Sequence, residues 1–186
     1  MEYFKPKEIA EALQLLEKGG HDARIIAGGT DLLIDLNNRK FSADLLVDIT
    51  DIDELKRITI ESDELVIGSA VTLTTIARNN LVCEHAEALA AGCASVGSLQ
   101  IRNIATLGGN VVNAQPAADG AMGLSVFEPT FIVCSMHGTR KLTMEQMYAG
   151  FGKSSLDSGK ELLTEIRIPC RKEGEASAFK RLELRK

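Results

Sequence analysis

The sequence predicts an α+β fold built from two units, and two observations lead to that prediction. The first part of the chain alternates helical and strand-like segments, whereas the second part carries a hairpin, a block of helices and further strands. No regular strand–helix repeat runs through the chain, which argues against a doubly wound parallel sheet. Long-period repeats of the solenoid kind are also absent. We therefore divide the chain into residues 1–57 and residues 58–186.

The first unit is expected to alternate helices and strands. Ile9, Leu13 and Leu16 recur at helical spacing, and Gly19-Gly20 would end the helix that carries them. Pro6 suits the opening turn of that helix. The expected elements are a helix at 6–20, a buried strand at 24–27, a helix at 30–40 capped by Thr30 or Asp31, and a strand at 44–50.

The second unit is expected to open with a hairpin around the turn residues Ser62-Asp63-Glu64. Two helices follow, and the second is rich in Ala and Gly, so we expect it to pack closely against a neighbour. A loop-rich stretch comes next, in which Asp119 opens a short helix. The expected elements are strands at 57–61 and 65–68, helices at 72–80 and 85–98, strands at 130–135 and 141–144 around a turn at His137-Gly138, and strands at 161–168 and 178–184.

The composition is that of a globular protein, and it argues against several classes of function. The 186 residues are 45% hydrophobic and 25% charged, with a formal net charge of -5. This balance, without a Lys/Arg cluster, argues against nucleic acid as a partner. The N-terminus lacks the apolar core of a signal peptide, and no apolar run reaches membrane-spanning length. We expect a cytoplasmic protein without a membrane span.

The cysteines are scattered and are expected to be reduced thiols, mostly in the core: Cys83, Cys93, Cys134 and Cys170. Cys83, His85 and Cys93 are conceivable metal ligands, but they lie in or beside one helical stretch and lack an obvious fourth ligand. Ferredoxin-type cysteine spacing is missing as well. We expect no metal site in this chain.

Two Gly-Gly loops, one in each unit, carry the functional signal. Residues 24–33 read RIIAGGTDLL, and residues 106–110 read TLGGN. Glycine lets a ligand approach the backbone, and the start of a helix offers N–H groups and partial positive charge to a phosphate. Together the loops would clamp a diphosphate between the units, although two structural turns explain them equally well. Neither loop fits the dinucleotide-binding fingerprint G-x-G-x-x-G or the P-loop.

The order of four motifs resembles the FAD-binding, or medium, subunit of the molybdenum hydroxylases, which include xanthine dehydrogenase-like and carbon monoxide dehydrogenase-like enzymes. The motifs are AGGTDLL, IRNIATLGGNVVNAQPAAD, ELLTEIRIP and SAFKRLELRK, and they span essentially the whole chain. The resemblance implies a PCMH-type FAD-binding fold with two subdomains and FAD extended between them. Members of this family usually continue into a C-terminal domain, which we expect to be absent here.

The resemblance also implies how the two loops hold FAD. The Gly28-Gly29 backbone and the Thr30 hydroxyl would line the diphosphate, and the second loop would complete the clamp. A branched side chain at Gly28 is accordingly expected to abolish FAD retention and to leave the fold largely intact. The residues expected from the loops are Ile26, Ala27, Gly28, Gly29, Thr30, Asp31, Leu32, Leu33, Thr106, Gly109 and Asn110.

Three further residues are implied outside the loops. Asp119 would accept hydrogen bonds from ribityl or ribose hydroxyls, with a helix N-cap as the alternative role. Leu162 and Lys180 match positions that contact the flavin or adenine end, and a solvated strand lysine is the alternative for Lys180. Arg102 would brace the second loop or serve only the surface, and Val96 is expected to pack rather than to contact FAD.

The function implied by the resemblance is electron transfer. Substrate would be oxidised at a molybdenum centre on a large subunit, and iron–sulfur clusters on a small subunit would pass electrons to FAD and on to NAD or another acceptor. This chain would hold no substrate-oxidising residue of its own and would act in a hetero-oligomer with those two subunits. The alternatives are a non-catalytic flavin- or nucleotide-binding module for assembly or sensing, and a structural subunit whose glycine pairs are only turns.

Overall fold

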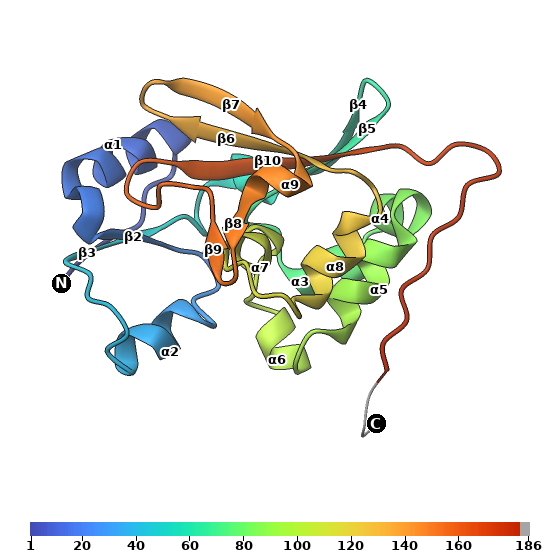
Figure 1. The fold of residues 1–186 in the computed structure, drawn as a ribbon. Coiled ribbons are helices and arrows are strands. Elements are labelled where there is room, and N and C mark those ends of the chain that lie inside the picture. The colour runs from blue at the N-terminus through green and yellow to red at the C-terminus, as the bar shows by residue number, and fades with distance from the viewer. Residues whose placement is uncertain (183–186) are drawn as a thin grey trace.

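Two sheets of different character organise the chain in this computed structural model, which describes residues 1–182 (Figure 1). The N-terminal sheet is parallel, and the larger second sheet is antiparallel. This architecture confirms the predicted α+β class. In spatial order, the first sheet contains β1 (Glu2–Phe4), β3 (Leu45–Asp48) and β2 (Ala23–Ile26), and the second contains β4 (Ile58–Glu61), β5 (Glu64–Gly68), β10 (Leu162–Pro169), β6 (Thr130–Ser135) and β7 (Gly138–Leu142).

Helices connect the parallel strands, because neighbouring parallel strands cannot be joined by a tight turn. α1 (Ile9–Gly19) links β1 to β2, and α2 (Leu32–Asn37) links β2 to β3. All residues of the central strand β3 are buried, as is typical of a parallel strand covered on both faces. The loop that contains Gly28 and Gly29 therefore lies at the carboxyl end of β2, where α/β proteins commonly bind ligands.

The antiparallel sheet begins with the predicted hairpin of β4 and β5. Ser62 and Asp63 form its turn with φ of 47° and 65°, the left-handed conformation that two-residue hairpins require. β10 is the central strand and pairs with β5 on one side and β6 on the other. The expected strand at 161–168 is confirmed within one residue.

Helices lie against the antiparallel sheet, and two short 3₁₀ helices and a small hairpin complete the fold (Figure 1). The hairpin of β8 and β9 reaches toward α7 in the middle of the molecule. The elements are 3₁₀ turns at Gly20–Asp22 and Asp53–Lys56, α3 (Leu73–Arg78), α4 (Asn80–His85), α5 (Glu87–Ser95), α6 (Leu99–Arg102), α7 (Leu107–Val112), α8 (Asp119–Ser125), α9 (Met144–Met147), β8 (Tyr148–Gly150) and β9 (Lys153–Ser154).

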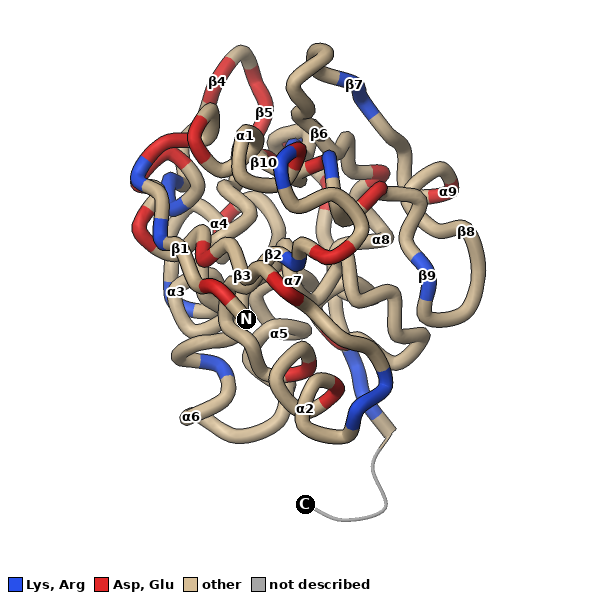
Figure 2. Tube along the Cα trace, turned by 90° about the vertical axis from the view of Figure 1, so that its left-hand side faces the viewer, with Lys and Arg blue, Asp and Glu red and all other residues tan. Residues whose placement is uncertain are grey.

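Charges of both signs are spread over the surface rather than gathered by sign (Figure 2). Basic residues occur on the C-terminal segment just before its grey end, and Asp31 and Asp35 lie at the start of α2 and within it. The longest helix of the described residues is α1, with 11 residues. Within that part of the chain, no helix has the length and apolar character needed to cross a bilayer.

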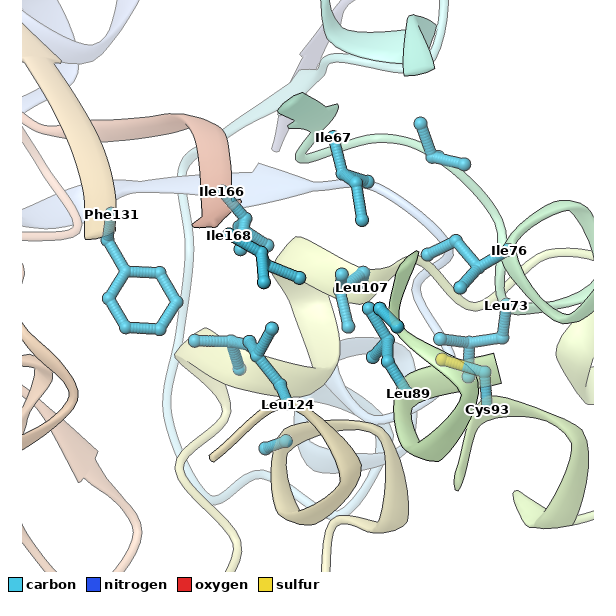
Figure 3. Packing of buried hydrophobic residues seen from close by; sticks show 14 of the residues in the cluster. Ile67, Leu73, Ile76, Leu89, Cys93, Leu107, Leu124, Phe131, Ile166 and Ile168 are labelled. Carbon is cyan, nitrogen blue, oxygen red and sulfur yellow. The ribbon is translucent and has the colours of Figure 1, made fainter. Parts of the chain in front are cut away.

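The main core lies between the antiparallel sheet and the helices (Figure 3). Phe131 of β6 and Ile166 and Ile168 of β10 point toward Leu107 of α7 and Leu124 of α8. These side chains are fully buried. A second cluster packs α1 on the parallel sheet and includes Leu162 at the start of β10, so the antiparallel sheet also contributes to the N-terminal core.

Close packing of the Ala/Gly-rich helix is confirmed, because α5 packs on α8 through glycines. A Cβ at Gly92 would lie 2.5 Å from the Asp119 carbonyl oxygen, and a Cβ at Gly123 would lie 2.5 Å from the Ala88 carbonyl oxygen. Only glycine allows two backbones to come this close. The contact fixes Asp119, the first residue of α8, against α5.

Several predicted boundaries are wrong. The first helix begins at Ile9 rather than at Pro6, and the stretch expected as one helix at 85–98 is divided at Ala86, whose φ of -143° ends α4 before α5 starts. The hairpin after β6 turns at Met136-His137, so β7 starts at Gly138 and not at Lys141. α7 forms inside the stretch expected to be a loop. Elements absent from the prediction are β1, α4, α6, α9, β8 and β9.

The prediction of a strand at 178–184 is also wrong for residues 178–182, the part of it that the structure describes. Residues 178–182 form no helix or strand, and residues 183–184 lie outside the described residues. The division of the chain at residue 57 stays a prediction.

Candidate functional site

A cleft of about 620 Å³ lies where the two sheets meet, within the usual size range of ligand pockets. The loop after β2 and the helix α2 line it from the N-terminal side. The opposite wall comes from α7, the start of α8 and the segment before β10. Both glycine loops therefore face the same space.

The first loop offers unused backbone donors to this cleft. The amides of residues 28–32 have no hydrogen-bond acceptor among residues 1–182. Gly29 adopts a φ of 67°, a conformation that favours glycine. Consecutive unpaired amides in a turn form an anion-binding concavity, and the following helix α2 adds partial positive charge. This loop can bind a diphosphate through its backbone.

The second loop differs, because its amides are already used. The amides of Leu107 and Gly108 donate to the carbonyl oxygens of Val71 (3.0 Å) and Ser69 (2.9 Å). The Gly109 amide donates to Thr106 Oγ1 at 3.1 Å, which makes Thr106 the N-cap of α7. The loop thus lines the cleft without presenting a row of amides.

The two loop regions are in direct backbone contact. A Cβ at Gly28 would overlap the Ile104 carbonyl oxygen and would lie 2.7 Å from Cα of Ala105. Gly28 is therefore needed for packing between the units. This contact argues against the expectation that a branched side chain at Gly28 leaves the fold intact.

Capping of the two downstream helices also differs from expectation. Asp31 occupies the N-cap position of α2, but no side-chain cap bond forms; the Thr30 hydroxyl instead donates to Asp31 Oδ2 at 3.2 Å. Ala118, not Asp119, is the N-cap of α8, so the alternative role of Asp119 as a helix cap is wrong. Asn110 Oδ1 accepts from the Ala121 amide at 3.0 Å and thereby ties the second loop to α8.

Most of the expected residues line the cleft. Ile26, Leu33 and Lys180 do not: Ile26 is buried against Ala43 and Leu46, Leu33 is 49% exposed, and Lys180 is exposed. Their roles in cofactor binding stay predictions, as do those of the residues that line the cleft. The expected residues that line it are Ala27, Gly28, Gly29, Thr30, Asp31, Leu32, Thr106, Gly109, Asn110, Asp119 and Leu162.

The structure adds cleft residues that sequence reasoning missed. Arg24 of β2 lines the cleft, and its guanidinium donates to the carbonyl oxygens of His21 (2.5 Å) and Ala23 (2.7 Å). The guanidinium also lies 5.2 Å from the centroid of the Phe41 ring, a cation–π distance. A single arginine in an otherwise apolar strand was the available sequence signal.

Ser69 is a second missed residue. It is 3% exposed, it lines the cleft, and its hydroxyl has no hydrogen-bond partner among the described residues. A buried hydroxyl normally has a partner, so its place beside the cleft favours a polar ligand there.

Arg102 and Val96 also have roles at the cleft wall. Arg102 Nη1 donates to the carbonyl oxygens of Val96 (2.9 Å) and Gly97 (3.1 Å), so it braces that turn rather than the second glycine loop. Val96 packs on the core and lines the cleft as well.

The acidic side chains of the cleft are mostly balanced by neighbouring cations. Asp35 pairs with Lys40 at 2.6 Å, and Glu161 pairs with Arg140 at 2.7 Å. Burial alone would raise the pKa of Glu161, but hydrogen bonds from Arg140 and the Asp157 amide outweigh it and lower the pKa. Asp119 pairs with Arg181 at 2.5 Å. An anionic ligand therefore meets little unbalanced negative charge at these carboxylates.

The thiols and carboxylates do not converge on a metal site in the part of the chain that is described. There, no group of three or more His, Cys, Asp or Glu side chains is placed to hold a metal ion. Cys93 is buried in the core, which raises the pKa of its thiol to about 12, whereas Cys83 is exposed.

Comparison with known proteins shows similarity along the chain. Residues 1–171 match the family described as FAD binding domain in molybdopterin dehydrogenase. The nicotinate dehydrogenase FAD-subunit of Eubacterium barkeri is 35% identical, over all of this chain and 64% of the relative. The xanthine dehydrogenase FAD-binding subunit of Escherichia coli O157:H7 is 34% identical, over 90% of this chain and 57% of the relative.

The fold also matches that of a solved structure along the whole chain. A chain of carbon monoxide dehydrogenase from Hydrogenophaga pseudoflava superposes with a TM-score of 0.94 at 29% identity, and the match covers all of this chain and 64% of that one. The chain thus spans between 57% and 64% of the length of the relatives it matches.

Proposed function

The chain belongs to the family of FAD binding domains in molybdopterin dehydrogenase, and from this premise we propose that it is the electron-transfer subunit of a multi-subunit molybdenum hydroxylase. Its cofactor is FAD, and the chain is a flavoprotein subunit of an oxidoreductase. In the proposed role, it receives electrons from the iron–sulfur clusters of a partner and passes them to NAD or another acceptor. The chain spans only 57% to 64% of the length of its relatives, so the activity and the substrate of a complete enzyme are not assigned from this chain alone.

The residues of the cleft fit FAD. Its diphosphate needs hydrogen-bond donors, and the unpaired amides of residues 28–32 supply them; the Thr30 hydroxyl would join them by turning from Asp31 Oδ2 to the phosphate. Its hydroxyl groups need acceptors, and Asp119 Oδ1 accepts no hydrogen bond from within residues 1–182. Ser69 provides one further unpaired hydroxyl. The run of free amides at the end of β2 is the observation that carries the proposal.

This chain's contribution would be to position the cofactor rather than to perform a chemical step. FAD supplies the electron-transfer chemistry when it is bound, and the protein orients it and tunes its surroundings. The contact of Gly28 with Ile104-Ala105 holds the two walls of the cleft at a fixed separation. Thr106 and Asn110 keep α7 and α8 in place behind the second wall.

Partner subunits are proposed from the names of the relatives. Carbon monoxide dehydrogenase of Afipia carboxidovorans has a medium chain that is 31% identical to 98% of this chain, and other relatives are named FAD-subunits. Such names imply further subunits in those enzymes. We assign an iron–sulfur small subunit and a molybdopterin large subunit as partners of this chain, in a hetero-oligomer located in the cytoplasm.

Anaerobic reduction of the FAD-loaded protein tests the proposal. The purified chain, loaded with FAD, should lose its oxidised-flavin absorbance when the pre-reduced iron–sulfur small subunit of a molybdenum hydroxylase is added, and NAD or another acceptor should restore it. The Gly28→Val variant, in which the cleft is disrupted, serves as the control without flavin. Uptake of FAD without reduction by the partner would overturn the electron-transfer role and favour a non-catalytic flavin-binding module. Failure to take up FAD would favour a structural subunit.

A further inference from the structure

The C-terminal segment of residues 170–182 follows β10 and runs in an irregular, extended path beside α5 and α8 (Figure 1). Ser177 Oγ accepts a hydrogen bond from the Ala88 amide (3.1 Å) near the start of α5. Arg181 Nη1 donates to the carbonyl oxygen of Ser95 (3.2 Å) at the end of the same helix. The segment is therefore attached at both ends of α5, at groups that the helix itself leaves unpaired.

Arg181 also reaches the cleft. Its Nη1 lies 2.5 Å from Asp119 Oδ2, and both residues line the cleft. The Asp119 side chain is 16% exposed, so its charge is less screened by water than that of a surface carboxylate. The basic residue that reaches the cleft is thus Arg181, whereas the neighbouring Lys180 is exposed outside it.

Arg24 cannot take over this role. It is the other basic residue among the described residues that line the cleft, but its guanidinium is held by the carbonyl oxygens of His21 and Ala23 on the opposite wall. The matched family domain ends at residue 171, so Arg181 lies outside it.

We infer that Arg181 is a positioning residue for FAD, which acts by holding Asp119 and neutralising its charge, and that residues 170–182 form a strap that brings it to the cleft. The inference rests on the assignment of FAD to this cleft. With Arg181 in place, one oxygen of Asp119 is held and the other faces ligand hydroxyls. Without it, a half-buried carboxylate stands uncompensated in a cleft that must accept a diphosphate dianion, and the two repel each other.

A double-mutant cycle in the full 186-residue chain tests the inference. FAD affinity is measured by fluorescence titration of the cofactor-free protein for Arg181→Gln, Asp119→Asn and the double variant. Arg181→Gln should weaken binding roughly tenfold, the scale of one charged hydrogen bond. In the Asp119→Asn background the same change should cost less than about twofold, because Arg181 acts through that carboxylate.

Salt dependence and matched controls separate this role from a merely structural one. The loss in Arg181→Gln should shrink at high salt, because repulsion between charges is screened. Arg181→Lys, which keeps the charge, should bind nearly as the unaltered chain does. Arg171→Gln, an exposed change in the same segment, should leave the affinity unchanged. The melting temperature of each cofactor-free variant shows whether the fold is retained.

Three results would overturn the inference. The first is binding of FAD by Arg181→Gln as tight as that by Arg171→Gln; the second is an equal loss of affinity with and without the Asp119 carboxylate; the third is a loss that does not depend on salt. Failure of the unaltered chain to bind FAD is a different result, since it overturns the proposed function itself and the inference with it.

Discussion

The two glycine loops look alike in sequence but do different work in the structure. Residues 28–32 leave their amides unpaired, whereas the amides of Leu107 and Gly108 are used by the carbonyl oxygens of Val71 and Ser69. The first loop is a donor surface and the second is a packed helix start that forms a wall. A Gly-Gly pair beside a threonine therefore does not by itself identify a phosphate-binding loop; the acceptors that its amides meet decide its role.

Substitution of Gly28 should have the largest effect and would test whether the first loop is also structural. Gly28→Val should lower the stability of the cofactor-free protein by about 1–3 kcal/mol, because the side chain must displace the Ile104-Ala105 backbone. Chemical denaturation of the cofactor-free protein measures this loss. Gly28→Ala should lose a large part of the same stability, because the Cβ of alanine alone overlaps the Ile104 carbonyl oxygen. Unchanged stability with lost FAD retention would mean that Gly28 serves the ligand alone.

The second loop can be tested with two adjacent glycines of α7. A Cβ at Gly108 would lie 2.6 Å from the Ser69 carbonyl oxygen, whereas a Cβ at Gly109 would meet only Thr106 Oγ1, at 3.1 Å. Gly108→Ala should therefore destabilise the cofactor-free protein by about 1–2 kcal/mol. Gly109→Ala, the matched control, should change stability by less than about 1 kcal/mol. Equal melting temperatures for the two variants would contradict the packing role of this loop.

The same change at the two threonines should give opposite results. Thr106→Val removes the N-cap of α7 and should lower stability by about 1 kcal/mol. Thr30→Val should alter stability by less than about 0.5 kcal/mol, since Thr30 makes only a side-chain bond to Asp31, yet should weaken FAD binding roughly tenfold. Thermal melts and FAD titrations of both variants measure this. A larger loss of stability in Thr30→Val than in Thr106→Val would contradict the assignment of a structural role to the second loop and a ligand-binding role to the first.

The last expected effect, the dependence of stability on acid, concerns Asp48 at the base of the first loop. Asp48 is buried beside the end of β2, and although burial alone would raise its pKa, hydrogen bonds from Thr50 and Tyr3 outweigh it and lower the pKa. A lowered pKa means that its stabilising effect is full above about pH 4 and is lost as the pH falls through the pKa of Asp48.

Tyr3→Phe removes one of these bonds and should cost about 1 kcal/mol at neutral pH. The difference from the unaltered protein should narrow at acidic pH, and denaturation at pH 7 and at pH 3 provides the comparison. A difference that is constant over this range would show that the bond does not depend on the charge of Asp48. The neutral cap at Thr106 predicts no such dependence for the second loop.

The sequence predicted the elements whose patterns are local. β3 and β10 are runs of apolar residues, and the hairpin around Ser62 and Asp63 has clear turn chemistry, so they were found within a residue or two. α7 was missed because its two glycines indicate a loop, and the helix is stabilised by acceptors on Val71 and Ser69, far away in the sequence.

The site was predictable to a similar degree. The glycine loops and Asp119 were identified, and the structure brings them to one cleft. The ion pair of Asp119 with Arg181 joins residues 62 positions apart and has no local signature. The contact between Gly28 and Ile104 is likewise a property of the assembled backbone. The sequence therefore identified the residues of the site but not the residues that they contact.

The position of β10 has a consequence for biosynthesis. This strand is near the end of the described chain, yet it lies between β5 and β6 in the sheet, and its first residue, Leu162, packs in the N-terminal core. While a ribosome is still making the preceding residues, β5 and β6 lack their shared neighbour and expose unpaired edges. The sheet closes only when β10 has left the ribosome, so the wall that positions FAD forms late in synthesis, and the cofactor should bind only after β10 has been released.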